Sequence, residues 1–197
     1  MTAAMWPDHL LTLEEFVEIP EDNSRRYELQ EGILIVSPRA AWLHQQVLMH
    51  LTMALYHQLP ADYRMAADME VVIDSRFPAT VRVPDLVIVP QETVKDNPPR
   101  LSADQVLVAV EVISPGSRRT DTRIKPDEYA EAGIPHYWVI DLNEPLSLAT
   151  YHQAGAFGYQ EAPAVTGVFE TNEPFPLRID LTELPDGPAR QHGEGNQ

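Results

Sequence analysis

The most apolar run of this chain is Val106-Leu107-Val108-Ala109-Val110-Glu111-Val112-Ile113, and a single carboxylate interrupts it. The run is rich in β-branched residues and ends at Ser114-Pro115-Gly116, so it predicts a central β-strand buried on both faces. An isolated ionised carboxylate in such a strand is costly unless a cation meets it. Glu111 therefore either pairs with a structural Arg or Lys, or takes part in a metal or catalytic site.

A second carboxylate has similar surroundings, in the β-branched run from Val81 to Pro90. Pro84 has no N–H to donate to a sheet, so it predicts a bend or an unpaired position immediately before Asp85. A bend beside an acid is one way of aiming a side chain. One buried acid can result from packing alone, whereas two acids on neighbouring apolar strands indicate a cation site.

The segment after Glu111 predicts a loop followed by a helix. Thr122 is the expected N-cap, because it places Pro126 in the first turn, where backbone N–H groups lack partners anyway. Gly133 is a stop signal, and a strand over 136–141 follows. This β–loop–helix–β unit brings the start of the helix close to the end of the Glu111 strand.

Basic residues gather at this helix start. Four of the fourteen Lys and Arg residues of the chain fall within eight positions: Arg118, Arg119, Arg123 and Lys125. Taken alone, such a cluster indicates a solvated helix face. Next to two buried acids, it predicts that the three arginines form a phosphate-facing patch.

These residues belong to an ordered set of motifs that covers most of the chain. The motifs are Tyr27-Glu28-Leu29 with Gly32, Ser37-Pro38 with His44, Arg82-Val83-Pro84-Asp85, Glu111-Val112-Ile113-Ser114-Pro115, and Asp121 with Lys125, Tyr129, Gly133-Ile134-Pro135 and Tyr137-Trp138. The set resembles the PD-(D/E)XK nuclease superfamily and, more closely, the Uma-two family of restriction endonuclease-like proteins. The resemblance implies an α/β fold with a restriction-endonuclease-like core, in which helices flank a mixed central β-sheet.

One position departs from the superfamily pattern. The catalytic lysine is expected two residues after the Glu, where this chain has Ile113. The Uma-two pattern has its lysine on the following helix, and its role therefore falls to Lys125.

The resemblance implies a metal-dependent site. Asp85, Glu111 and the carbonyl of Val112 would bind a hard divalent cation; Mg²⁺ suits oxygen ligands, and Mn²⁺ can substitute for it. Lys125 would orient the attacking water or stabilise charge in the transition state. Asp121, four residues before the lysine, is placed to position it.

Two further candidate catalytic residues leave alternatives open. Glu28 either reaches the metal site from the first hairpin or pairs with Arg25 or Arg26 across that hairpin. His44 lies in the apolar stripe of a helix predicted over 42–59, so it points toward the sheet. It is either a core histidine without function or a member of the site.

The functional prediction is an endonuclease that hydrolyses phosphodiester bonds of nucleic acid, with DNA as the first substrate. The formal net charge of −16 opposes this, since phosphate backbones are bound largely by Lys and Arg, and it predicts weak intrinsic affinity. Two alternatives remain open: a non-catalytic binding or regulatory protein on the nuclease fold, and a phosphohydrolase for small nucleotides.

Length and composition predict one domain over 1–184 and a flexible tail over 185–197. No apolar stretch reaches the roughly 18 residues of a membrane span, so no membrane partner is expected. The chain has no cysteine, which is compatible with a reducing compartment, and we expect a cytoplasmic protein.

The far side of the 42–59 helix predicts an interface. Trp42, Met49, Met53 and Tyr56 form an apolar face opposite the stripe that faces the sheet. Restriction-type nucleases that cut both strands use two sites, so the resemblance implies a homodimer joined through this face. The alternative is that the N-terminal segment or the C-terminal strands cover it within one chain.

Overall fold

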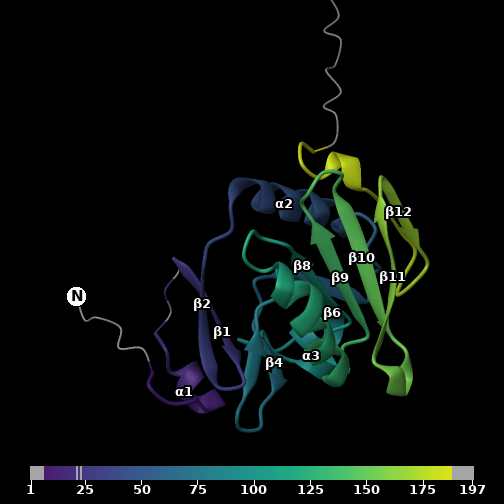
Figure 1. Cartoon of the computed structure of the whole chain (residues 1–197). Helices are drawn as coiled ribbons and strands as arrows, with labels where there is room; N and C mark the ends of the chain where they lie inside the picture. Colours follow the sequence, from purple (N-terminus) through teal and green to yellow (C-terminus); the bar gives the residue numbers. More distant parts are fainter. Residues whose placement is uncertain (1–6, 21, 23, 188–197) are drawn as a thin grey trace, which may run out of the picture.

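The computed structural model describes residues 7–20, 22 and 24–187, which form β-sheets with helices packed on them (Figure 1). The five-stranded sheet has the order β2-β1-β5-β4-β7 and consists of β1 (Arg25–Gln30), β2 (Ile33–Pro38), β4 (Val71–Asp74), β5 (Thr80–Arg82) and β7 (Leu101–Ser102). The six-stranded sheet has the order β11-β10-β9-β8-β6-β3 and consists of β3 (Tyr63–Ala67), β6 (Leu86–Pro90), β8 (Val108–Val112), β9 (His136–Asp141), β10 (Ser147–Gln153) and β11 (Tyr159–Thr166). A separate hairpin pairs β12 (Val168–Thr171) with β13 (Leu177–Asp180).

Three α-helices cover these sheets: α1 (Leu13–Val17), α2 (Trp42–Tyr56) and α3 (Lys125–Glu131). α2 and the β12–β13 hairpin pack on one face of the six-stranded sheet, and the buried stripe of α2 is His44, Val47, Leu48, Leu51 and Leu55. Tyr129 of α3 and Ile134 pack on the opposite face, with Tyr137 and Val139 of β9. α1 packs Phe16 against the five-stranded sheet. Helices therefore flank a mixed sheet, as predicted.

The Glu111 strand is confirmed as β8, in the interior of the six-stranded sheet with all five of its residues buried. β8 pairs antiparallel with β6 and parallel with β9. α3 lies between the parallel strands in the chain, which confirms the predicted β–loop–helix–β unit. Side chains of β8 alternate between the two sheet faces, so Val110 contacts the α2 side while Glu111 points toward α3.

The run from Val81 to Pro90 is interrupted where the sequence predicted a bend. β5 ends at Arg82 and β6 begins at Leu86, and the two strands belong to different sheets. Pro84 and Asp85 lie in the short segment between them. The missing N–H of Pro84 is compatible with this unpaired crossing.

The start of the second helix differs from the prediction. Thr122 is not an N-cap, because it lies inside a π-helical turn, Thr120–Ile124, that leads directly into α3. Its hydroxyl donates to the Arg118 carbonyl at 2.7 Å. Pro126 cannot make the usual helical hydrogen bond to residue 122, and the wider turn accommodates this loss. The predicted stop is correct, since Gly133 has φ +82° and the Ile134 N–H donates to the Tyr129 carbonyl.

The expected first hairpin is confirmed, whereas β3, β7, β12 and β13 were not predicted. A capping box of Thr12 and Glu15 begins α1. His50 is half-buried, and its Nδ1 lies 2.7 Å from the Leu184 carbonyl oxygen. The predicted tail lies outside the described residues from 188 onward. In the described part of the chain, no helix is long and apolar enough to cross a bilayer.

Candidate active site

Asp85 lies where the chain crosses from the five-stranded to the six-stranded sheet, and it is 1% exposed. Its Oδ2 accepts the Val112 N–H at 2.8 Å, which fixes the crossing against the end of β8. Its Oδ1 accepts a hydrogen bond from Arg26 Nη1 at 2.7 Å and lies 3.2 Å from His44 Nε2. Both carboxylate oxygens therefore have partners within the protein.

The surroundings of Asp85 keep it ionised. Burial alone would raise the pKa of its carboxyl, but the close approach of His44, the charge of Arg26 and the Val112 N–H outweigh burial and hold the pKa at about 2. The His44 ring lies at ion-pair distance from Asp85 without the alignment of a good hydrogen bond. Its other nitrogen, Nδ1, lies 3.1 Å from Ser114 Oγ. His44 thus faces the sheet, as predicted, and contacts a candidate metal ligand.

Lys125 reaches Glu111 from α3. Its Nζ donates to Glu111 Oε1 at 2.6 Å and lies 3.4 Å from both Glu28 Oε1 and Asp121 Oδ1. The Tyr129 hydroxyl donates to the same Glu111 oxygen at 3.2 Å. One lysine therefore sits among three acids, and the expected placement of Asp121 beside Lys125 is observed.

The environment raises the pKa of both Glu111 and Lys125, which makes the carboxyl easier to protonate and the ammonium harder to deprotonate. Burial raises the pKa of the Glu111 carboxyl well above its ordinary value; Asp85, Asp121 and Glu28 add to this, and Lys125 opposes it. Burial would lower the pKa of Lys125, but its acidic neighbours, Glu111 first, raise it well above the ordinary value. Lys125 thus stays charged, and the Glu111 carboxyl takes up a proton more readily than an ordinary glutamate.

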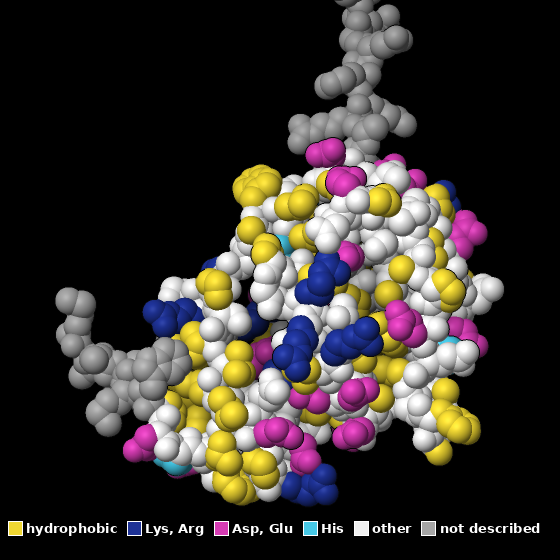
Figure 2. All heavy atoms as spheres, in the orientation of Figure 1, with side chains coloured by type: hydrophobic (Ala, Val, Ile, Leu, Met, Phe, Trp, Pro, Cys, Tyr) yellow, Lys and Arg dark blue, Asp and Glu magenta, His cyan; other side chains and the backbone are white. Residues whose placement is uncertain are grey.

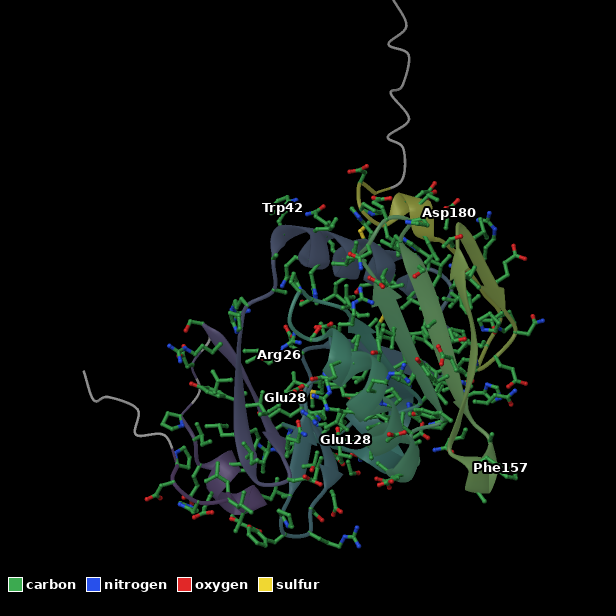
Figure 3. All side chains as sticks on the ribbon, in the orientation of Figure 1. Arg26, Glu28, Trp42, Glu128, Phe157 and Asp180 are labelled. Carbon is green, nitrogen blue, oxygen red and sulfur yellow. The ribbon has the colours of Figure 1, made fainter. Side chains whose placement is uncertain are left out.

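Arg82 was missed as a site residue by sequence reasoning. Its guanidinium is fully buried, donates to both Glu128 oxygens at 2.7 Å and donates to Glu28 Oε2 at 3.1 Å. Glu28 also accepts the Val83 N–H at 3.0 Å. Figure 3 shows Glu28 and Glu128 lying between the β1–β2 hairpin and α3. The expected alternative for Glu28, a pair with Arg25 or Arg26, is wrong. Arg82 could have been found from the sequence, because it is a charged residue inside a β-branched run, as are Asp85 and Glu111.

The charge balance of this cluster fits a divalent cation. Its buried members are four acidic and two basic side chains: Glu28, Asp85, Glu111 and Asp121 against Arg82 and Lys125. The half-buried Arg26 and Glu128 add one side chain of each kind, so the acidic side chains outnumber the basic ones by two. The described residues contain no group of three or more His, Cys, Asp or Glu side chains arranged to hold a metal ion. The donor set would therefore be small: two carboxylates and a backbone carbonyl, all oxygen, as a hard cation prefers.

The cluster lines a cavity of about 850 Å³ between the β1–β2 hairpin, the start of α2 and the loop after β8. Arg118, Arg119 and Arg123 are exposed and do not line it. Arg118 instead makes two 2.7 Å hydrogen bonds to Asp141. Figure 2 shows basic side chains gathered on the surface over the segment that leads into α3. The arginines that line the cavity include Arg25 and Arg26 of β1.

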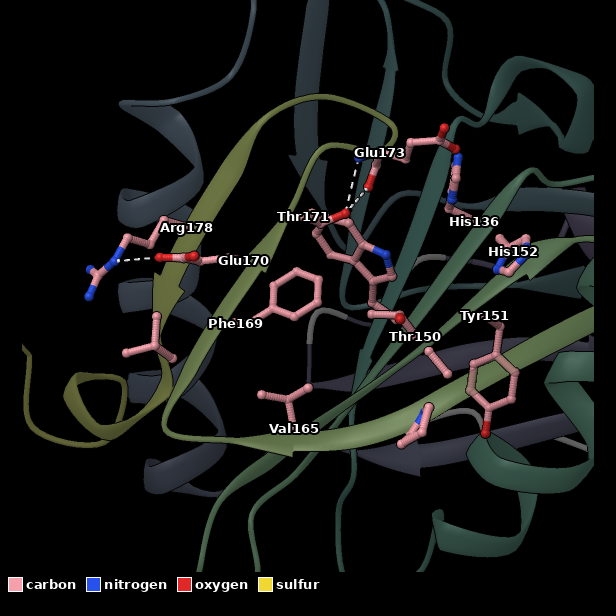
Figure 4. Close-up of a pocket in the computed structure, with 14 residues that line it drawn as sticks. His136, Thr150, Tyr151, His152, Val165, Phe169, Glu170, Thr171, Glu173 and Arg178 are labelled. Carbon is pink, nitrogen blue, oxygen red and sulfur yellow. Dashed lines mark hydrogen bonds and ion pairs between the residues drawn. The ribbon is translucent and has the colours of Figure 1, made fainter.

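A second cavity, of about 910 Å³, lies between β9–β11 and the β12–β13 hairpin (Figure 4). Its lining includes His136, His152, Phe169 and Glu173. It contains none of the candidate catalytic, metal-binding or phosphate-facing residues that the sequence singled out. The cluster of buried charges, and not the larger volume, identifies the candidate active site.

Comparisons with known proteins agree with this fold. A family model described as Uma2, "Putative restriction endonuclease", matches residues 13–182. A crystal structure titled as a putative nuclease belonging to DUF820, from Anabaena variabilis, superposes with a TM-score of 0.68 at 17% sequence identity, covering 88% of this chain and 97% of that one. No curated protein sequence matches significantly.

Proposed function

This chain belongs to the Uma2 family, and from that membership and the buried acid cluster we propose that it is a metal-dependent nuclease that hydrolyses phosphodiester bonds, with DNA as the first substrate to test. The observation that carries the proposal is the excess of buried acidic over basic side chains along a cavity, beside a buried lysine. Structural ion pairs alone give a fold no reason to keep such an excess.

Asp85, Glu111 and the Val112 carbonyl would hold Mg²⁺, or Mn²⁺ in its place. Bound there, the ion would polarise a phosphoryl oxygen and lower the pKa of an attacking water. Loss of a proton from Glu111 on binding is expected, because burial, with the charges of Asp85, Asp121 and Glu28 adding to it, raises the pKa of its carboxyl, and a bound cation favours the ionised form.

Lys125 would act on the phosphoryl group. Its ammonium is charged, and Glu111, Glu28 and Asp121 hold it at the edge of the cavity. A fixed positive charge stabilises negative charge that develops in the transition state more than the ground state. Glu28 and Asp121 are then positioning residues for the lysine.

The test is a cleavage assay with single-stranded DNA, duplex DNA and RNA, each with Mg²⁺, with Mn²⁺ and with a chelator. Asp85→Asn and Glu111→Gln are expected to abolish cleavage and calorimetric Mn²⁺ binding. Glu131→Gln is the matched control for the loss of one negative charge, since Glu131 is exposed and does not line the cavity. Mn²⁺ binding that persists in the Asp85→Asn and Glu111→Gln double variant would place the metal elsewhere.

A small-nucleotide phosphohydrolase is a second candidate, favoured by the net charge of −16, which repels long polyanions more than short ones. Nucleoside triphosphates added to the same assay test it. Hydrolysis of these nucleotides without cleavage of any polymer would replace the first proposal. Metal binding with no hydrolysis of any substrate would favour the non-catalytic alternative.

A homodimer remains part of the proposal. Trp42, Met49, Met53 and Tyr56 are 79%, 46%, 49% and 72% exposed on α2. No part of the described chain covers this face. Two active sites joined through it would act on both strands of a duplex.

A further inference from the structure

Arg26 connects the candidate metal site to the open cavity. Its Nη1 donates to Asp85 Oδ1 at 2.7 Å, and its Nη2 pairs with Asp68. The Arg26 side chain is 26% exposed and lines the cavity, whereas the side chains of Arg82 and Lys125 are 0% and 5% exposed. Figure 3 shows Arg26 on the β1 side of the site, beside Glu28.

The position of Arg26 conflicts with metal binding at Asp85. The Arg26 guanidinium and the His44 ring already meet Oδ1, and Oδ2 accepts the Val112 N–H. A divalent cation needs a carboxylate oxygen and repels a guanidinium at that distance. Arg26 and the cation therefore compete for Asp85.

Asp68 gives Arg26 a second anchor that does not depend on the metal ligand. Asp68 has φ +53°, a left-handed conformation that Asp tolerates better than most residues. Its carboxylate is 52% exposed and lies outside the buried cluster. A guanidinium carries five N–H donors in a rigid fork, so Arg26 can keep Asp68 on one nitrogen and exchange the partner of the other.

We propose that Arg26 is a substrate-binding residue that moves from Asp85 to the phosphodiester when the metal binds. This inference rests on the proposed function. In the metal-free protein Arg26 neutralises Asp85; with metal bound, its Nη1 turns to a phosphate oxygen in the cavity while Asp68 holds Nη2. Because the coupling is reciprocal, a phosphodiester that engages Arg26 also frees Asp85 for the metal. Metal and substrate then bind cooperatively.

The first experiment uses the unmodified protein. Mn²⁺ is titrated by calorimetry with and without dimethyl phosphate, a phosphodiester anion with poor leaving groups. Dimethyl phosphate is expected to tighten Mn²⁺ binding on the order of tenfold, within the usual range of coupling between sites. The absence of any such effect would overturn the inference.

The second experiment separates Arg26 from direct contact between phosphate and metal, which would also couple the two. Arg26→Gln is expected to tighten Mn²⁺ binding on the order of tenfold without phosphate, since the competitor is gone, and to lose the part of the phosphate effect that direct contact between phosphate and metal does not supply. Arg25→Gln is the matched control: it removes the same charge from the same cavity rim, but Arg25 pairs with Asp22 and not Asp85. A small shift in the control measures long-range electrostatics alone.

A third variant, Arg26→Lys, keeps the positive charge and so tests the inference even if Arg26→Gln does not fold. Arg26→Lys keeps a charge but has a single nitrogen, so it cannot hold Asp68 and a phosphate together in the same way, and it is expected to show weaker coupling. Coupling that persists unchanged in Arg26→Gln or Arg26→Lys would overturn the inference. Failure of the unmodified protein to bind Mn²⁺ at all would instead overturn the proposed metal site.

Discussion

At the scale of single residues, substitution of Lys125 distinguishes a catalytic role of this lysine from a purely structural one. Lys125→Ala is expected to lower turnover by a factor on the order of a hundred or more, while Mg²⁺ affinity stays equal or rises. The affinity does not fall because the ammonium is not a ligand and repels the ion. The measurements are single-turnover cleavage and calorimetry, below the melting temperature of each variant.

The same substitution also affects stability, because Lys125 is paired with three buried acids. The metal-free Lys125→Ala protein should melt at a lower temperature, and Mg²⁺ should restore part of the loss by supplying positive charge. Lys125→Arg should recover stability better than turnover, since a planar fork does not replace a point charge. Cleavage at the parental rate in Lys125→Ala would end the catalytic assignment.

The contributions of the two candidate metal ligands to the free energy of unfolding should depend on pH in opposite directions. Asp85 has a folded-state pKa of about 2, below its ordinary 3.8. Its stabilising contribution is therefore present above pH 4 and is lost as pH falls toward 2. This contribution is about 2 kcal/mol. The pKa of Glu111 is raised above its ordinary 4.5. The stability that its protonated carboxyl contributes is therefore present below pH 4.5 and is lost as pH rises through the folded-state pKa.

At neutral pH in metal-free buffer, Asp85→Asn should therefore destabilise the protein, and Glu111→Gln should leave it equally stable or make it more stable. Urea unfolding between pH 3 and 7 (a window set by these shifts) measures both differences. A cost of Asp85→Asn that is the same at pH 3 and pH 7 would contradict the pKa assigned to Asp85.

Sequence analysis identified candidate site residues well where a charged side chain lies in a run that is expected to be buried. Glu111 and Asp85 stood out because each interrupts an apolar run, and the structure buries both. Their partners were harder to predict, because pairing depends on contacts between distant segments: Arg26 and Asp85 are 59 residues apart, and Arg82 and Glu128 are 46 apart. Local spacing placed Asp121 beside Lys125 because those two residues share one helical segment.

At the scale of elements, local signals worked when they acted within a few residues. The glycine stop at Gly133 was predicted correctly, and a capping box at Thr12, a signal of the same short range, begins α1. Thr122 carried a cap signal but lies in a π-helical turn, because the preceding helical turn continues through it. β12 and β13 were missed because their pairing buries Phe169 and Ile179 against α2 and the six-stranded sheet, a tertiary effect without a long local pattern.

Thr12→Ala and Thr122→Ala form a matched test of this difference. Thr12 accepts the Glu15 N–H, so its loss should cost about 1 kcal/mol of unfolding free energy. Thr122 only donates to the Arg118 carbonyl within the helical turn, so replacement by the better helix former alanine should be nearly neutral. Urea unfolding of both variants measures the two changes in unfolding free energy. A loss in Thr122→Ala equal to that in Thr12→Ala would show that Thr122 acts as a helix cap after all.

At the scale of the whole molecule, charge limits how two copies can meet. The chain carries a net charge of −16, so most pairs of surfaces repel each other. α2 contains no Asp, Glu, Lys or Arg, and its exposed face is apolar. This face is one surface through which two copies can associate without bringing like charges together.

We therefore expect a homodimer through α2 that strengthens with salt, because salt screens the repulsion between the two acidic chains and leaves apolar contact intact. Met53→Glu and Tyr56→Glu should shift the protein to monomer in analytical ultracentrifugation. Phe157→Glu is the matched control: Phe157 is 91% exposed, and Figure 3 shows it at the opposite end of the molecule from Trp42.

A monomer at tens of micromolar (the order expected for a weak interface) in both low and high salt would contradict the predicted homodimer. Dissociation caused equally by Phe157→Glu would instead place the contact elsewhere. Cleavage of both strands of a duplex by a monomer would show that the second site is not needed.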